Sequence, residues 1–126
     1  MVIDAKNVSG SAQNGVVMLT FANDAVAPSQ YVLLQRALNP SQQDKDLGQD
    51  RVHIQINAEL NSGYGDISEA SLDASGLSLR LSQETAARLR TDEHVEIRFN
   101  LSTQQYRDIE TKLATMIGRE RLRSHG

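Results

Sequence analysis

Apolar and polar residues alternate along several short stretches of this chain, which is the pattern of half-buried β-strands. The alternation predicts strands over residues 2–8, 52–59, 77–81 and 94–101. Residues 16–22 and 31–37 are instead apolar on both faces, which predicts strands buried in the middle of a sheet. A further strand is expected over residues 67–73. Its apolar residues change from an odd position, Ile67, to even positions, Ala70 and Leu72, and an extra residue that restores their common side predicts a β-bulge.

Two segments carry helix signals. Ser82 is a suitable N-cap for a short helix over residues 83–90, and Ser102 or Thr103 for a final helix with one apolar stripe. Gly118 stands where that helix should end. We therefore expect an α+β fold with a mainly antiparallel sheet of about seven strands. The short helix and the C-terminal amphipathic helix should pack on one face.

The segments between the predicted strands are rich in turn-forming residues. Residues 9–15 contain Gly, Asn and Ser throughout and predict a turn. The polar stretch 37–50 predicts a long loop, with a helical turn that starts at Pro40. In residues 62–66, SGYGD, the two glycines predict a tight turn that presents Tyr64.

Length and composition limit the domain organisation. With 126 residues we expect one domain over 1–118 and a frayed basic tail over 119–126. The chain has no cysteine, which excludes disulfides, cysteine zinc sites and a thiol nucleophile. The N-terminal residues lack the features of a secretory signal, and no apolar run is long enough to span a membrane, so we expect a cytoplasmic protein.

The net charge of −3 lowers the expectation of nucleic-acid binding, which normally needs a basic face. Within the loop, Asp44, Asp46 and Asp50 have a spacing that invites a calcium site. However, Gln49 and Gln55 stand where an EF-hand needs glycine and an acid, so no metal is expected there.

No catalytic constellation is present in the sequence. His53 and His94 occupy outward-facing positions of the predicted strands, and no nucleophile motif accompanies them. Gln35 and Arg36 end an apolar strand just before the loop. We expect the Arg36 guanidinium to bind the loop carboxylates and hold the loop in place. The alternative, a phosphate ligand on Arg36, lacks a supporting glycine loop.

Four blocks of sequence together resemble the immunity protein 10 family of bacterial polymorphic toxin systems. They are YVLLQR (31–36), QQDKDLGQD (42–50), VHIQIN (52–57) and SGYGDI (62–67). The segments LSLRLSQETAARL (77–89) and EIRFNLS (96–102) also stand where the family has later elements. Asp66 and Gln49 depart from the family pattern, which expects glycine and a hydrophobic residue there.

The resemblance implies a small cytoplasmic protein that binds and neutralises a cognate toxin domain, without catalysis or cofactor. As a hypothesis, the toxin contacts Asp44, Asp46, Asp50, Tyr64 and Asp66. The loop would be ordered by Gln35, Arg36, Gly48, Gly63 and Gly65. Two alternatives remain: a small-ligand or metal-binding module between the acidic loop and Tyr64, and a homodimeric scaffold joined through an exposed sheet edge.

Overall fold

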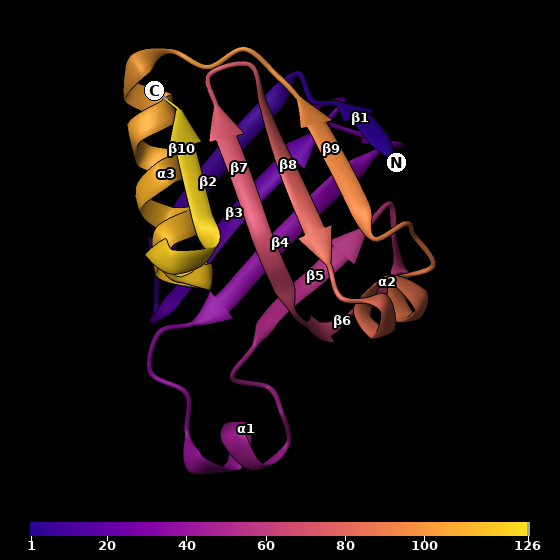
Figure 1. The fold of residues 1–126 in the computed structure, drawn as a ribbon, viewed down its shortest axis with the longest axis vertical. Coiled ribbons are helices and arrows are strands. Elements are labelled where there is room, and N and C mark those ends of the chain that lie inside the picture. The colour runs from indigo at the N-terminus through magenta and orange to yellow at the C-terminus, as the bar shows by residue number, and fades with distance from the viewer. Residues whose placement is uncertain (126) are drawn as a thin grey trace.

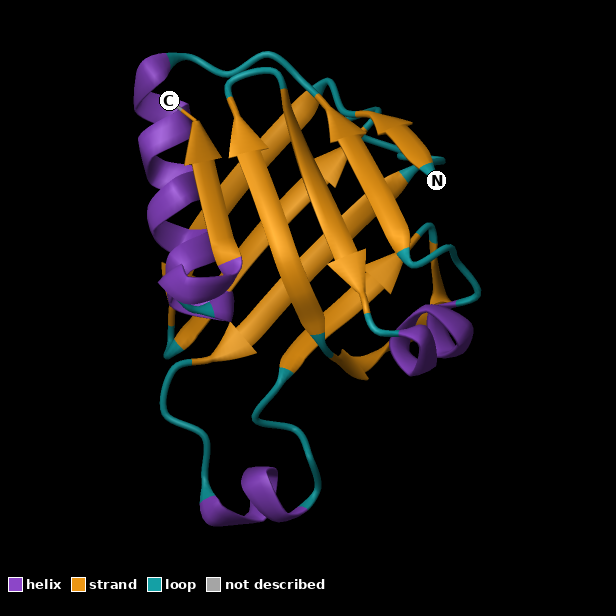
Figure 2. Ribbon diagram, in the orientation of Figure 1, coloured by secondary structure: helices purple, strands orange, loops and turns teal. Residues whose placement is uncertain are grey.

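Two five-stranded sheets face each other, and their strands cross at an angle (Figures 1 and 2). This computed structural model describes residues 1–125, with only the backbone of Glu59 and Leu60. Sheet A has the order β1 (Val2–Asp4), β9 (His94–Arg98), β8 (Gly76–Leu81), β7 (Ile67–Asp73) and β10 (Leu122–His125). Sheet B is a meander of β2 (Asn7–Gln13), β3 (Val16–Ala22), β4 (Tyr31–Ala37), β5 (Val52–Ile56) and β6 (Ala58–Gly65).

The core lies between the two sheets because each strand turns its apolar residues inward. Leu19, Phe21 and Leu34 of sheet B are fully buried, as are Leu79 and Ile97 of sheet A. The Phe21 ring stacks on that of Phe99, with centroids 5.9 Å apart, and so joins the two layers. Fully burying one such side chain contributes about 1.5–3 kcal/mol, so this layer dominates the stability of the fold.

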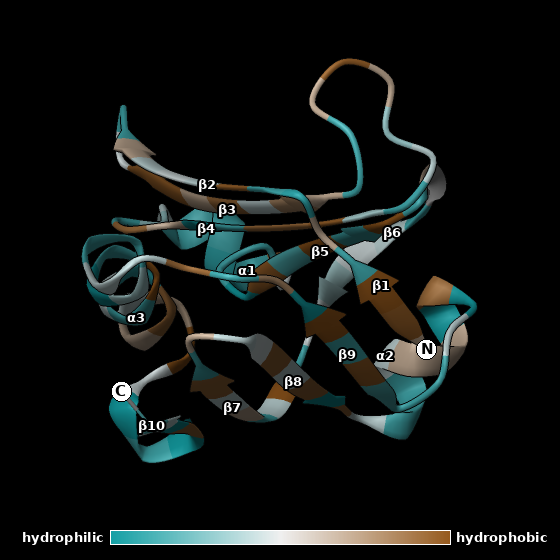
Figure 3. Ribbon diagram, turned by 90° about the horizontal axis from the view of Figure 1, so that it is seen from above, coloured by the Kyte–Doolittle hydropathy of each residue, from teal (hydrophilic) through white to brown (hydrophobic). Residues whose placement is uncertain are grey.

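Helix α3 (Thr103–Ile117) closes one side of the sandwich, between the two layers (Figure 3). It contacts β2 and β3 of sheet B and β7 and β10 of sheet A. The residues that it buries form the predicted apolar stripe: Tyr106, Ile109, Leu113, Met116 and Ile117. Among the described residues, no helix is long and apolar enough to cross a membrane.

Several predicted features are confirmed. The α+β class is correct, and the pairing of β7 with β8 has the predicted irregularity between Ile67 and Glu69. Helix α2 (Gln83–Leu89) is capped by Ser82, whose hydroxyl accepts from the Thr85 amide. Ser102 caps α3 in the same way, and Gly118 ends α3 with a φ of 88°.

The strand count differs from the expected seven, because ten strands over residues 1–125 form two sheets. Residues 9–13, expected to turn, belong to β2, and only Asn14 and Gly15 turn, with φ values of 54° and 76°. Two consecutive positive φ values are the signature of a tight hairpin. The polar sequence of β2 does not predict a strand by itself, but its backbone hydrogen-bonds to the neighbouring β3 along its whole length.

The chain also folds differently after β5. The predicted strand 52–59 is broken at Asn57, which has a φ of 61°. Its side-chain oxygen accepts from the Tyr31 amide at 2.8 Å, which fixes this turn against β4. Residues 119–125 are not frayed: a short 3₁₀ turn (Arg119–Arg121) leads into β10, which pairs in parallel with β7. Gly126 lies outside the described residues.

Candidate functional site

The loop between β4 and β5 extends beyond the end of the sandwich and carries the short helix α1 (Gln42–Asp46) at its tip (Figure 1). The helix starts at Gln42, two residues later than the predicted Pro40, because Ser41 is its N-cap. The Ser41 hydroxyl accepts from the Asp44 amide at 3.0 Å, and the Asp44 carboxylate accepts from the Ser41 amide at 3.0 Å. This reciprocal cap gives a helix of one turn a defined geometry.

The loop carboxylates do not converge on a common point. One oxygen of Asp44 is used in the cap, and Asp46 accepts from the Gln42 side chain at 2.9 Å. Within residues 1–125, no three His, Asp or Glu side chains gather as cation ligands. The three aspartates therefore form a row of exposed or half-exposed charges on a protruding segment, which suits contact with a partner.

Arg36 connects the base of this loop to helix α3. Its Nε donates to the Asp50 carbonyl at 3.0 Å, and an Nη donates to the Met116 carbonyl in the last turn of α3. The predicted contact with loop carboxylates is wrong, since the ion pairs between described residues do not include Arg36. The reason is the side of the strand that Arg36 occupies: it is paired with the buried Val17, so its side chain points between the sheets.

The glycines predicted to order the loop have two different surroundings. Gly48 lies in the loop with a φ of 73°, and its amide donates to the Lys45 carbonyl at 3.1 Å as α1 ends. Gly63 and Gly65 belong to β6, so the predicted tight turn at residues 62–66 is wrong. A Cβ at Gly65 would lie 2.7 Å from the Thr85 hydroxyl, which shows that these glycines let α2 approach β6 closely.

Tyr64 lies on the outward face of sheet B, at the base of the loop. Its ring meets that of His53 edge-on, with centroids 5.0 Å apart. The two rings, together with Gln35 and Gln49, line a hollow of about 260 Å³. Burial lowers the pKa of His53, whose Nδ1 has no hydrogen-bond partner among the described residues. Gln35 is thus part of this hollow and points outward.

Asp66 follows β6 and is engaged within the protein. Its two carboxylate oxygens accept from Arg51 at 3.2 and 2.5 Å, and its amide donates to the Thr85 hydroxyl at 3.1 Å. Arg51 stands at the point where the loop returns to β5. The structure therefore places Tyr64 and Asp66 at the base of the loop and the other three predicted contact residues on it, without forming one pocket.

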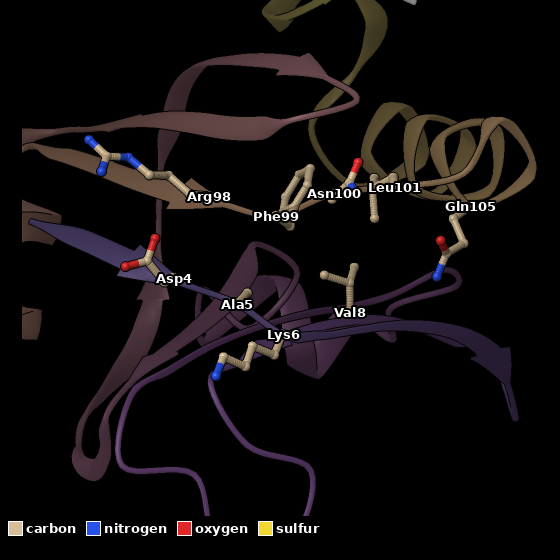
Figure 4. Close-up of a pocket in the computed structure, with 9 residues that line it drawn as sticks. All are labelled: Asp4, Ala5, Lys6, Val8, Arg98, Phe99, Asn100, Leu101 and Gln105. Carbon is tan, nitrogen blue, oxygen red and sulfur yellow. The ribbon is translucent and has the colours of Figure 1, made fainter.

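A second hollow, of about 460 Å³, was not indicated by any sequence pattern (Figure 4). It lies at the end of the sandwich opposite α1, between β1, the end of β9 and the start of α3 (Figure 1). Phe99 and Leu101 supply its apolar wall, and Asp4, Lys6 and Arg98 lie around it. These residues are far apart in the sequence and have no shared motif, so only the fold brings them together.

A family model described as Immunity protein 10 matches residues 4–107, which is most of the chain. The matched part includes both sheets except the first two residues of β1 and all of β10, and it ends inside α3. No curated protein matches the sequence.

Proposed function

The chain belongs to the immunity protein 10 family, and we propose that it binds a cognate toxin domain in the cytoplasm and neutralises it without catalysis. The family match over residues 4–107 is the observation that carries this proposal. The match includes the protruding loop and its base. A partner that must be recognised among many proteins needs a surface with distinctive shape and charge, and the loop provides both.

The charge of the loop supports recognition of a basic partner. Residues 38–50 contain three aspartates and one lysine, which gives a net charge of −2 within thirteen residues of a protein whose total is −3. Charges on a protruding segment attract an oppositely charged partner during diffusion and raise the association rate, most strongly at low salt. We propose Asp46 and Asp50 as the main contributors, because Asp44 also caps α1.

The loop is held in one conformation before any partner arrives. Arg36 joins it to α3, the Ser41–Asp44 cap fixes α1, and the Gln49 amide donates to the Asp44 carbonyl at 2.7 Å. Ordering a flexible loop on binding would cost free energy that a preformed loop does not lose. Tyr64 and Asp66 stand at its base, and we propose that they complete the contact surface.

A small-ligand role is less well supported. The hollow beside Tyr64 has about 260 Å³, slightly below the range of roughly 300–1,000 Å³ in which small-molecule sites fall. The larger hollow in Figure 4 is lined by residues from β1, β2, β9 and α3 and from the segments between them, but they include both signs of charge and define no single ligand chemistry.

The proposal is tested by association kinetics with the toxin domain that is captured with this protein from the producing cells. The double variant Asp46→Asn/Asp50→Asn should lower the association rate about tenfold at low salt, with a smaller effect at high salt. Glu93→Gln/Glu120→Gln changes the net charge equally, at exposed positions outside the loop, and should leave the rate nearly unchanged. Equal effects of both double variants would show that only net charge matters and would refute the loop as contact surface.

A further inference from the structure

The outward face of strands β2 to β5 of sheet B carries no Asp, Glu, Lys or Arg. Every outward position of β2, β3, β4 and β5 is apolar, an uncharged polar residue or His53, as the strand registers show. We call its central part the uncharged face: Ser11, Met18, Thr20, Leu33, Gln35 and Gln55. The outward face of sheet A differs, with charged residues that include Glu69, Arg80, Glu96 and Arg123. A sheet face meant for water normally resembles that of sheet A.

The middle of the uncharged face is apolar. Met18 and Leu33 are half-buried and lie on neighbouring strands, where Met18 faces Gln35 and Leu33 faces Thr20. No helix covers this side, because α2 and α3 pack against the inward side of sheet B, at Gly63, Gly65 and Gly10. This part of the face is thus uncharged, and no described helix covers it.

An apolar loop stands beside this face. Residues 23–30 connect β3 to β4 and rise from sheet B on the side away from sheet A (Figure 3). Its tip is Val26, which is 92% exposed, more than the other exposed large hydrophobic residues of the described chain. Exposed apolar surface marks an interaction site when it forms a patch and not a single residue, and Val26 stands among Ala25, Ala27 and Pro28, which are all exposed.

The tip is held rigidly. The side-chain oxygen of Asn23 accepts from the amides of Ser29 and Gln30, both at 3.1 Å, and Asp24 accepts from the Val26 amide at 2.9 Å. The Asn23 side chain also donates to the Ser29 hydroxyl at 3.0 Å. This network fixes an exposed valine that makes no compensating contact within the chain, so the loop is arranged to meet something outside it.

We propose that the uncharged face, with the Val26 loop beside it, binds the same face of a second copy of this chain. Ser, Thr and Gln each carry both a hydrogen-bond donor and an acceptor, so such a face can satisfy a copy of itself. A face with Lys or Glu would meet like charges across a two-fold axis, and here there are none. The contact uses the face of sheet B, not an open sheet edge.

The size of the face predicts a weak dimer. Three strands of seven residues and one of five, spaced ~4.8 Å apart, give roughly 420 Å² per copy. Two copies with their 23–30 loops then bury about 1,000 Å² or slightly more, the low end for a specific interface. The α1 loop extends along the long axis of the molecule, away from this face, so it stays accessible in the dimer (Figures 1 and 3). Tyr64 and the hollow that it shares with Gln35 lie on this same side of sheet B, so of the proposed toxin contacts only those on the loop are independent of the dimer. Sedimentation needs no toxin, so it tests the dimer separately from the proposed function.

Sedimentation velocity of the purified chain over micromolar to millimolar concentrations tests the inference without any toxin. The mass should rise from 13.9 kDa towards twice that value as concentration increases. Leu33→Lys places two like charges in the interface and should weaken the dimer at least tenfold. Val26→Asp, at a position too exposed to affect folding, should do the same. Ser71→Lys, on the outward side of sheet A, is the matched control and should dimerise like the wild type.

Two results would overturn the inference. A wild-type mass of one chain at all concentrations would show that the face has no affinity for itself, and would leave it to a different partner. A dimer that persists in both Leu33→Lys and Val26→Asp would place the contact on another surface. Circular dichroism of each variant confirms that a lost dimer reflects the interface and not unfolding.

Discussion

Arg36 should stabilise the protein and its protruding loop at the same time, because its guanidinium binds carbonyls on two separate elements. In Arg36→Gln, the side chain is too short to reach both the Asp50 and Met116 carbonyls. A hydrogen bond from a charged donor contributes about 1.5–3 kcal/mol. Because Arg36 is half-buried and water can replace part of the loss, we expect the free energy of unfolding to fall by about 2–3 kcal/mol.

The loop should respond more than the rest of the chain. Loss of the Asp50 contact removes the link between the loop and α3, so amide hydrogen exchange should accelerate across residues 43–50. A loss of 1.4 kcal/mol in local stability corresponds to about a tenfold faster exchange. Urea unfolding gives the global value, and exchange followed by mass spectrometry gives the local one.

Arg51→Gln is the matched control for this prediction. Arg51 also ends the loop and makes two hydrogen bonds, but to the exposed carboxylate of Asp66. Exposed ion pairs contribute at most about 1 kcal/mol, so its loss should be small. If Arg36→Gln costs no more than Arg51→Gln and leaves loop exchange unchanged, the role given to Arg36 is wrong.

Two further substitutions test the packing of β6 and the burial of His53. Gly65→Ala should destabilise the protein by about 1–3 kcal/mol in urea unfolding, because its Cβ would overlap Thr85 of α2. Gly63→Ala meets only the flexible Arg88 side chain and should cost less; a larger cost would contradict this explanation. For His53, burial lowers the pKa in the folded state, so the unfolded state binds the proton more readily. Stability should be complete above pH ~6.5 and fall as the pH drops below it, and His53→Gln should reduce that dependence; an unchanged pH profile would show that another group causes it.

Local patterns in the sequence predicted β3, β4, β7, β8, β9 and the two capped helices. The alternating stretches 2–8 and 52–59 were wrongly predicted as single strands, because each is divided between two strands. Local patterns failed where a neighbour decides the structure. The polar β2 pairs because β3 lies beside it, and β10 because β7 offers a free edge. Gly63 and Gly65 resemble turn residues, but they serve close packing of α2, which no local pattern reveals.

In the candidate site, too, the sequence indicated which residue is unusual but not which residues it contacts. Arg36 was correctly identified as unusual, but its partners were not. Its parity with the inward Val32 and Leu34 could have shown that it points between the sheets. The carbonyl of Met116 is 80 residues away in the sequence, and only the packing of α3 brings it near. The lack of charged residues at the alternate positions that form the uncharged face was also visible in the sequence. That these positions form an exposed surface could be recognised only once the structure showed which side of each strand is covered.

Binding of a toxin domain is the central claim, and capture of the tagged protein from the cells that produce it tests this claim most directly. Mass spectrometry of the captured complex should find, in stoichiometric amount, a toxin domain of a larger secreted protein. That domain should arrest growth when it is produced alone, and this protein should restore growth when produced with it. A toxin domain encoded nearby that neither binds this protein nor loses toxicity in its presence would contradict the account.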